Sequence, residues 1–202
     1  MTPTRLRSAL LAVSLTAGLL GTATPAGATP APSLTCQGVG VDPGPIHYRT
    51  ETLIKAPPGA VWQLHTDVAG WPAWQQAVTS ASRLDPGPLR PGSRFRWTTP
   101  APPTPTTPGT TLAITSTVEQ SRPGRCVRWT GPAIGDGLRI DRGVHVWTFT
   151  PVPAGVFVRT EESWRGEQIE TDPATANRYL AAGLDAWVAA LKTTAEARSC
   201  DR

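Results

Sequence analysis

IKAPPGAVWQLHTDVAGWPAW, from Ile54 to Trp74, carries the strongest signal for the architecture of this chain. The Pro-Pro-Gly run inside it ends any strand that leads into it, because proline cannot donate to a ladder. Apolar residues then recur at helical spacing from Val61 to Val68 and predict a short helix. A second short helix is expected from Trp71, with Asp67 near its start. The sequence therefore predicts two short helices between a first strand and the strands that follow.

Strand patterns flank this stretch on both sides. Alternating, Thr-rich residues from His47 to Ile54 predict the strand before it. From Thr79 to Trp164 the sequence repeats short β-type runs with Gly or Pro at each junction. After a first short strand, we expect strands at Ser93–Thr98, Thr111–Val118, Cys126–Thr130, Val144–Thr150 and Val156–Trp164. This order is typical of an α+β domain with an antiparallel sheet.

The chain closes with a pattern for one long helix. Asp172 is a good N-cap, and Pro173 suits the first helical position. An apolar stripe follows at helical spacing, formed by Leu180, Leu184, Trp187, Val188, Leu191 and Ala195. About 26 residues at 1.5 Å each give a rod of roughly 39 Å, long enough to cross a whole sheet.

The first residues have the pattern of a targeting segment. A basic start precedes an apolar run from Ala9 to Leu20, and Ala26-Gly27-Ala28 then gives a small-x-small cleavage site. We expect residues 1–28 to be a secretory signal peptide cleaved near Ala28, residues 29–45 to be a Pro/Gly-rich arm, and residues 46–200 to form the domain. The expected localisation is secreted, extracellular or in the cell envelope.

Charge and cysteine usage exclude several classes of partner. The formal net charge is +4, and two of the arginines fall in the predicted signal, so nothing favours nucleic acid. The apolar run is shorter than the roughly 20 residues of a membrane span, so stable membrane insertion is not expected. Three cysteines allow one internal bridge, and none has metal-ligand spacing. No metal or cofactor is expected.

Five segments carry a resemblance to a known family. They are IKAPPGAVWQLHTDVAGWPAW, PGSRFRW (91–97), HVWTFTP (145–151), TEESWRG (160–166) and AWVAALKTTAEA (186–197). Together they resemble the START-like (SRPBCC) superfamily, which includes the polyketide cyclase/dehydrase and lipid transport proteins. The resemblance runs from about Ile46 to Arg198. It implies a helix-grip (Bet v 1-like) fold, in which a curved seven-stranded antiparallel sheet wraps the C-terminal helix around an apolar cavity.

Strand alternation separates the side chains that face this interior from those that face water. Eight tryptophans are spread over nearly every expected element, which suggests a wide interior or a lined pocket. The candidate ligand-binding residues are Phe95, Trp97, Ile114, Ser116, Trp129, His145, Trp147, Thr160, Glu162, Trp164 and Leu184. A mostly apolar pocket with a few orienting polar groups is usual for small-molecule sites. Each indole is also compatible with ordinary core packing.

Alternate connections of an antiparallel sheet lie at the same end. The connections Thr99–Thr110 and Gly131–Gly137 should therefore share one rim with Gly166–Asp172. In the family such loops gate the cavity, so this rim is the expected entrance. The opposite rim would hold Cys126 and Cys200, which are the candidate disulfide, with Cys36 unpaired.

Three functions are compatible with these patterns. The first is a secreted binding protein for a hydrophobic or aromatic small molecule held in the cavity. The second is a polyketide cyclase/dehydratase-like enzyme, with His145 and Glu162 on adjacent strands as the candidate proton-transferring residues. The third is a cell-surface protein-interaction module. The sequence contains no nucleophile–base pair or cofactor loop. Export also argues against a cyclase that acts on carrier-bound polyketides. These patterns therefore favour a binding protein over an enzyme.

Overall fold

The computed structural model describes Cys36, residues 38–105 and residues 107–200. The predicted signal peptide and residues 29–35 of the predicted arm lie outside the described residues. The strands are β1 Ile46–Ile54, β2 Ser80–Arg83, β3 Arg94–Ala101, β4 Thr110–Arg122, β5 Cys126–Gly135, β6 Leu138–Val152 and β7 Gly155–Arg165. The α-helices are α1 Pro58–Thr66 and α2 Pro173–Cys200, and the 3-10 helices are η1 Val68–Ala73 and η2 Ile169–Thr171.

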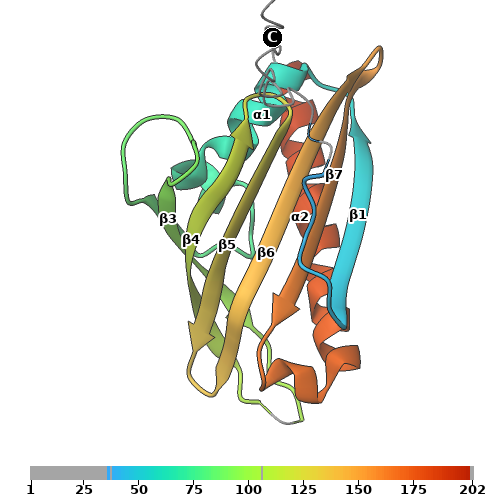
Figure 1. Ribbon diagram of the computed structural model, residues 1–202. Helices are drawn as coiled ribbons and strands as arrows, with labels where there is room; N and C mark the ends of the chain where they lie inside the picture. The colour runs from blue at the N-terminus through green and yellow to red at the C-terminus, as the bar shows by residue number, and fades with distance from the viewer. Residues whose placement is uncertain (1–35, 37, 106, 201–202) are drawn as a thin grey trace, which may run out of the picture. The chain divides into compact units, whose positions relative to one another are not determined.

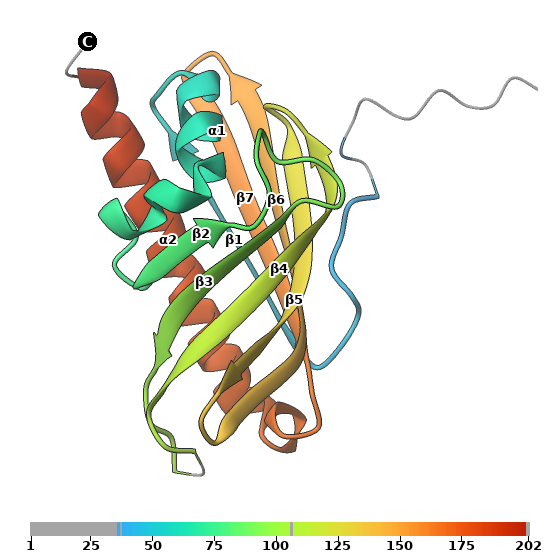
Figure 2. The same ribbon diagram turned by 90° about the vertical axis from the view of Figure 1, so that its left-hand side faces the viewer.

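The strands form one antiparallel sheet in the order β1-β7-β6-β5-β4-β3-β2. All neighbours except β1 and β7 are joined by short connections, and β1 closes the far edge against β7. Helix α2 lies along one face of the sheet, which we call the inner face, and α1 and η1 lie across one end (Figures 1 and 2). The predicted helix-grip fold is confirmed.

The two short helices form where the sequence predicts them. Pro58 occupies the first turn of α1, and Val61 and Leu64 bury its apolar face. The backbone then turns at Asp67, whose carboxylate accepts a hydrogen bond from the Gly70 N–H at 3.3 Å. Because Asp67 caps η1 directly, the second helix begins at Val68 rather than at Trp71.

The long helix also agrees with its sequence signals. Asp172 Oδ1 accepts a hydrogen bond from the Thr175 N–H at 3.0 Å, as an N-cap should. All six residues of the predicted apolar stripe are buried. Helix α2 makes its most extensive contacts with β1 and therefore reaches across the edge strand that lies furthest from β2.

The strands β5 and β6 are longer than predicted. Strand β5 continues through Gly131, which the sequence pattern assigns to a connection, and β6 begins at Leu138, directly after the turn at Asp136 and Gly137. Gly131 lies opposite Gly143 beside a register shift. A Cβ at Gly131 would lie 2.1 Å from the carbonyl oxygen of Thr115. Glycine here therefore lets the ladder bend closely against β4 rather than ending it.

The predicted sharing of one rim is confirmed by hydrogen bonds between the connections. Tyr179 of α2 donates its hydroxyl to the Pro103 carbonyl at 3.3 Å, and the Asp136 N–H donates to Thr110 Oγ1 at 2.9 Å. The Gln168 side-chain amide donates to the Gly137 carbonyl at 2.7 Å. The β3–β4 connection, the β5–β6 turn and the start of α2 therefore meet at one end of the sheet (Figure 2).

The disulfide prediction is wrong. Cys126 bonds Cys36, with 6.1 Å between the two Cα atoms, and Cys200 is an exposed free thiol. Cys126 and Cys200 do lie toward the same end of the sheet, but on opposite faces. Alternation along β5 turns Val127 and Trp129 inward and Cys126 outward, away from α2. The outward cysteine therefore bonds Cys36 rather than Cys200.

The helices of the described part of the chain are all too short or too polar to cross a bilayer.

Candidate functional site

The inner face of the sheet carries an imidazole and a carboxyl group side by side. His145 of β6 pairs in register with Glu162 of β7 and, on its other side, with Trp129 of β5. Side chains at paired positions of neighbouring strands point to the same face, so all three face α2. The prediction that His145 and Glu162 are neighbours on adjacent strands is confirmed.

These side chains belong to a continuous polar chain. Trp164 Nε1 donates to Glu162 Oε1 at 2.8 Å, and Glu162 Oε2 lies 3.3 Å from His145 Nδ1. His145 Nε2 lies 2.7 Å from Thr160 Oγ1, and the Thr160 hydroxyl donates to the Val146 carbonyl at 3.2 Å. Since the Thr160 proton is committed to that carbonyl, its oxygen accepts from His145 Nε2–H. The Nδ1 atom of a neutral His145 then carries a lone pair directed toward Glu162.

Burial decides where the shared proton lies. Burial raises the pKa of Glu162 to about 7, and the hydrogen bond from Trp164 opposes that rise only in part. Burial, together with the neighbouring His65, holds the pKa of His145 well below its usual value. Both effects favour a protonated Glu162 beside a neutral His145 rather than an ion pair. At 3.3 Å the carboxyl proton can be donated to the bare Nδ1.

Aromatic rings surround this chain on the α1 side. His65 is fully buried, with ring centroids 4.3 Å from Trp147 and 5.8 Å from Trp129. Trp71 and Trp187 meet edge to face at 5.2 Å. We call the following residues the aromatic cluster: His65, Trp71, Phe95, Trp129, Trp147, Phe149 and Trp187. At these separations the rings fill this half of the interior by contact with one another.

Several polar atoms of the aromatic cluster are unpaired. Both ring nitrogens of His65 and the indole nitrogens of Trp147 and Trp187 are buried without a hydrogen-bond partner among the described residues. Burial lowers the pKa of His65 to about 3, so its ring is neutral and offers one donor and one acceptor. Buried polar groups usually have partners, so four unpaired nitrogens in one cluster are unusual. Because the rings around them pack against one another, a ligand would reach these nitrogens only if the rings moved apart.

The other half of the interior is more open. The Glu162 side chain retains 17% exposure against 2% for His145, although Glu162 is on a strand flanked by β1 and β6. Trp97 and Trp164 are only partly buried against a second apolar cluster, which contains Leu184 and Ile114. These inner-face side chains contact solvent, so α2 does not cover this part of the inner face completely.

The structure brings the predicted ligand-binding residues to this one face. Phe95, Trp129 and Trp147 lie in the aromatic cluster, whereas Ile114, Trp164 and Leu184 lie in the second cluster. Trp97 contacts both clusters and donates its Nε1–H to Ser116 Oγ at 3.2 Å. Thr160 and Ser116 are buried polar groups among them. Their role as ligand contacts stays a prediction.

Sequence reasoning missed four residues that border the site. His65, Trp71 and Trp187 form the centre of the aromatic cluster, and Tyr48 pairs in register with Glu162 and donates its hydroxyl to Asp185 of α2 at 3.2 Å. Helical spacing did place His65 with the apolar residues of α1. That signal showed burial of the ring but not what it would contact.

Two open hollows lie away from this site. One, of about 240 Å³, lies between α1 and α2 and is bordered by Leu64 and Arg198. The other, of about 340 Å³, lies between Trp62 and Leu89. None of the predicted ligand-binding residues lines either hollow. Among the described residues no three His, Cys, Asp or Glu side chains are grouped as a metal ion requires.

The raised pKa of Glu162 predicts a pH-dependent stability. The carboxyl binds its proton more tightly in the folded chain, at about 7 against 4.5, so the free energy of unfolding falls as pH rises through this window. The fall amounts to at most about 3 kcal/mol. Glu162→Gln should therefore gain stability relative to the wild type between pH 4.5 and 7, as measured by urea unfolding.

A matched control separates this effect from that of the histidines, whose depressed pKa values lower stability on the acid side. Glu51 of β1 faces outward, where its carboxylate pairs with Arg159 at 2.8 Å, so its replacement disturbs no histidine contact. Glu51→Gln should give a difference from the wild type that does not grow with pH across this window. An equal trend in both variants would contradict the assignment.

The site lies in a fold shared with known proteins. TTHA0849 from Thermus thermophilus superposes with a TM-score of 0.61 at 20% identity, covering 76% of this chain and 99% of that one. The Zhui aromatase/cyclase from Streptomyces sp. R1128 gives 0.56 at 16% identity, with coverage of 75% and 94%. Ara h 8.0201 gives 0.57 at 11% identity, with coverage of 74% and 96%. These identities establish the fold alone.

The comparison with protein families is more specific. No curated protein matches the chain. Residues 45–196, which span all seven strands and nearly all of α2, match the family described as polyketide cyclase/dehydrase and lipid transport. With the fold, the inner-face site and this match in agreement, the chain belongs to the polyketide cyclase/dehydrase and lipid transport family.

Proposed function

We propose that this protein is an exported binding protein for a hydrophobic or aromatic small molecule, held on the inner face of the sheet. The observation that carries the proposal is the partly accessible carboxyl of Glu162, which accepts a hydrogen bond from the Trp164 indole and lies beside His145. A polar group of this kind orients a ligand whose affinity comes from apolar burial. The family's association with cyclases and lipid transport supports the same class of ligand.

The unpaired nitrogens narrow the chemistry of the ligand. An aromatic molecule with a carbonyl or hydroxyl oxygen would accept a hydrogen bond from protonated Glu162 and, once the rings of the aromatic cluster move apart, from the indole N–H of Trp147 or Trp187. Its ring would stack on the indoles. A purely aliphatic chain would give these donors no partner and would therefore gain no hydrogen bond from them. We therefore favour an oxygen-bearing aromatic ligand over a simple lipid.

Tryptophan fluorescence tests this proposal. The probes are 1-naphthol, a hydroxyanthraquinone and dodecanoic acid. We expect saturable quenching by the aromatic probes and weaker binding of dodecanoic acid. Because the ligand accepts a hydrogen bond from protonated Glu162, the affinity for an aromatic probe that stays neutral should fall about tenfold per pH unit above about 7.

The variants of Glu162 and Glu161 make this test specific. In Glu162→Gln the affinity should no longer depend on pH in this window, because the amide does not ionise. Glu161→Gln, on the outer face of the same strand, should retain the wild-type pH dependence. An unchanged emission spectrum with all three probes, or the same pH dependence in Glu162→Gln, would refute the proposal.

A second function, acid–base catalysis related to that of the cyclases, is favoured by one specific observation. A carboxyl whose pKa lies near 7 beside a neutral imidazole can both give and take a proton at neutral pH. The aromatase/cyclase among the structural neighbours is compatible with such a role. Conversion of an aromatic polyketide mimic should then be lost in both His145→Ala and Glu162→Gln. Turnover that survives both changes eliminates this function.

Export is proposed on two grounds. The N-terminal pattern ending at Ala28 is that of a signal peptide, and the Cys36–Cys126 bridge is of the kind that persists in oxidising compartments. Expression of the full chain in a secreting bacterial host should yield a protein in the medium or envelope that begins at Thr29. Recovery of the uncleaved chain from the cytoplasm alone would contradict this.

A further inference from the structure

Cys36 and residues 38–45, which we call the strap, cross the outer face of the sheet. Figure 1 shows the strap as the blue segment in front of the sheet, running toward the start of β1. It is fixed at one end by the disulfide to Cys126 at the start of β5. At its other end, the Asn177 side-chain amide donates to the Pro45 carbonyl at 2.7 Å. The strap thus spans the sheet from one rim toward the other.

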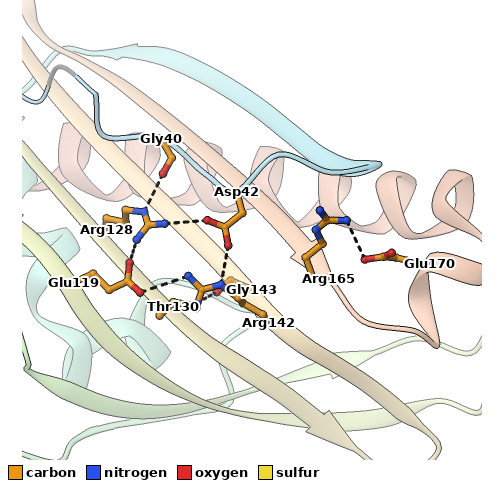
Figure 3. Close-up of polar contacts among 9 residues, drawn as sticks. All are labelled: Gly40, Asp42, Glu119, Arg128, Thr130, Arg142, Gly143, Arg165 and Glu170. Carbon is orange, nitrogen blue, oxygen red and sulfur yellow. Dashed lines mark hydrogen bonds and ion pairs between the residues drawn. The ribbon is translucent and has the colours of Figure 1, made fainter.

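Between these ends the strap is held by arginines from the strands below it. Arg128 Nε donates to the Gly40 carbonyl at 2.9 Å, and its guanidinium lies 3.2 Å from Asp42 Oδ1. Arg142 Nε donates to Asp42 Oδ2 at 2.7 Å (Figure 3). The hydrogen bond from Arg142, together with the charges of Arg142, Arg128 and Arg165, lowers the pKa of Asp42. One strap carboxylate therefore joins two strands, β5 and β6.

This charge arrangement depends on the strap. Glu119 of β4 pairs with Arg128 and lies 3.5 Å from Arg142, so two arginines share two carboxylates when the strap is in place. Burial lowers the pKa of Arg128, whereas Asp42 opposes that effect. Removal of Asp42 would leave two neighbouring guanidinium groups with one carboxylate, and they would repel each other. On the outer face, β5 and β6 are therefore held together partly by the contacts of Arg128 and Arg142 with the strap.

The same strand segments carry the inner-face site on their other side. Arg128 precedes Trp129, and Arg142 precedes Gly143, beside which Glu162 and Trp164 lie. Val144 and Val146 flank His145, point away from α2, and are only 1% and 3% exposed. The strap is the segment that crosses this face in Figure 1. A change on the outer face therefore acts on the backbone that positions the inner-face residues.

We propose that the strap stabilises β5 and β6, the strands that carry Trp129 and His145, under the redox control of the Cys36–Cys126 bridge. We call this stabilisation the brace. With the Cys36–Cys126 bridge closed, the strap holds β5 and β6 rigid. With the bridge reduced, the strap leaves the outer face, and β5 and β6 open locally more often. Reduction by a dithiol breaks the S–S bond, and each cysteine sulfur gains one hydrogen. The dithiol is oxidised to its own disulfide. Only the predicted effect on ligand affinity depends on the proposed function.

Hydrogen exchange tests the brace without any ligand. In a Cys200→Ser background, which removes the free thiol, the oxidised protein is compared with the dithiothreitol-reduced protein and with Cys36→Ser. We expect amide exchange over 127–131 and 143–147 to accelerate at least tenfold more than over 94–101 of β3, both in the reduced protein and in Cys36→Ser. Reoxidation with glutathione disulfide should restore slow exchange in the reduced protein.

A second variant keeps the disulfide bridge and removes only the negative charge of Asp42. Asp42→Asn should speed exchange over the same two segments by about threefold or more. Its control is Glu51→Gln, which removes an outer-face carboxylate that pairs with Arg159 at 2.8 Å and does not touch the strap. Glu51→Gln should leave both segments at the wild-type rate.

Each outcome supports or overturns the brace. Unchanged exchange over 127–131 and 143–147 after confirmed loss of the bridge overturns it. Equal acceleration of exchange throughout the sheet, β3 included, also overturns it, because the bridge would then stabilise the whole domain without local control. If exchange changes as expected but 1-naphthol binds neither form, the brace stands and the proposed function fails. If 1-naphthol binds, its affinity should fall at least fivefold on reduction.

Discussion

Trp71→Ala should destabilise the domain by about 4 kcal/mol and lower the melting temperature by about 10 °C. Trp71 is fully buried, and its ring packs edge to face against Phe95, Trp97 and Trp187. Its Nε1–H also donates to the His65 carbonyl at 2.8 Å, which fixes the end of α1. The substitution removes both the apolar contacts and this hydrogen bond. Urea unfolding followed by circular dichroism measures the loss.

Two controls separate the contributions. Trp71→Phe keeps most of the apolar volume but removes the donor to His65, and should cost about 1–2 kcal/mol. Trp62→Ala removes an indole that is only partly buried, against Phe149, and should cost less than Trp71→Ala. A loss below about 1.5 kcal/mol for Trp71→Ala would mean that the aromatic cluster repacks around the gap.

Cys36→Ser should lower the free energy of unfolding by about 2–5 kcal/mol. The bridge joins residues 90 positions apart and so restricts a large loop of the unfolded chain. Urea unfolding with and without dithiothreitol measures the effect. The wild type in dithiothreitol should approach Cys36→Ser, and the variant itself should not respond to the reductant.

Cys200→Ser is the matched control for that experiment. Cys200 is exposed and unpaired, so the change should alter stability by no more than about 0.5 kcal/mol. If the wild type and Cys36→Ser unfold at the same urea concentration, the bridge does not stabilise the fold. A large effect of Cys200→Ser together with no effect of Cys36→Ser would indicate that the sequence-based pairing of Cys126 with Cys200 forms in solution.

The local signals in the sequence are sufficient for most of the fold. Proline and glycine punctuate the strands, Asp172 caps the long helix, and the apolar stripe from Leu180 to Ala195 marks the buried face of α2. These signals depend on neighbours close in the chain. The extension of β5 through Gly131 could not be predicted in this way, because glycine is needed there for close approach to the backbone of Thr115 on another strand.

The candidate site was predictable only in outline. Alternation along β6 and β7 gives the face on which His145 and Glu162 lie, and adjacency of the strands gives their proximity. Whether Glu162 is protonated depends on how far the surrounding elements exclude water. His65 illustrates the same limit, since the helix pattern indicates burial but the rings that surround it come from β5, β6 and η1.

The order of elements, the face of each strand and the family can all be read from the amino-acid chain before it folds. The partner of Cys126, the location of the proton between Glu162 and His145, and the packing of the indoles against one another emerge only in the folded molecule. Secondary structure and alternation follow from periodicities of a few residues. A disulfide, a shifted pKa or a filled interior depends instead on groups that meet only when distant segments fold together.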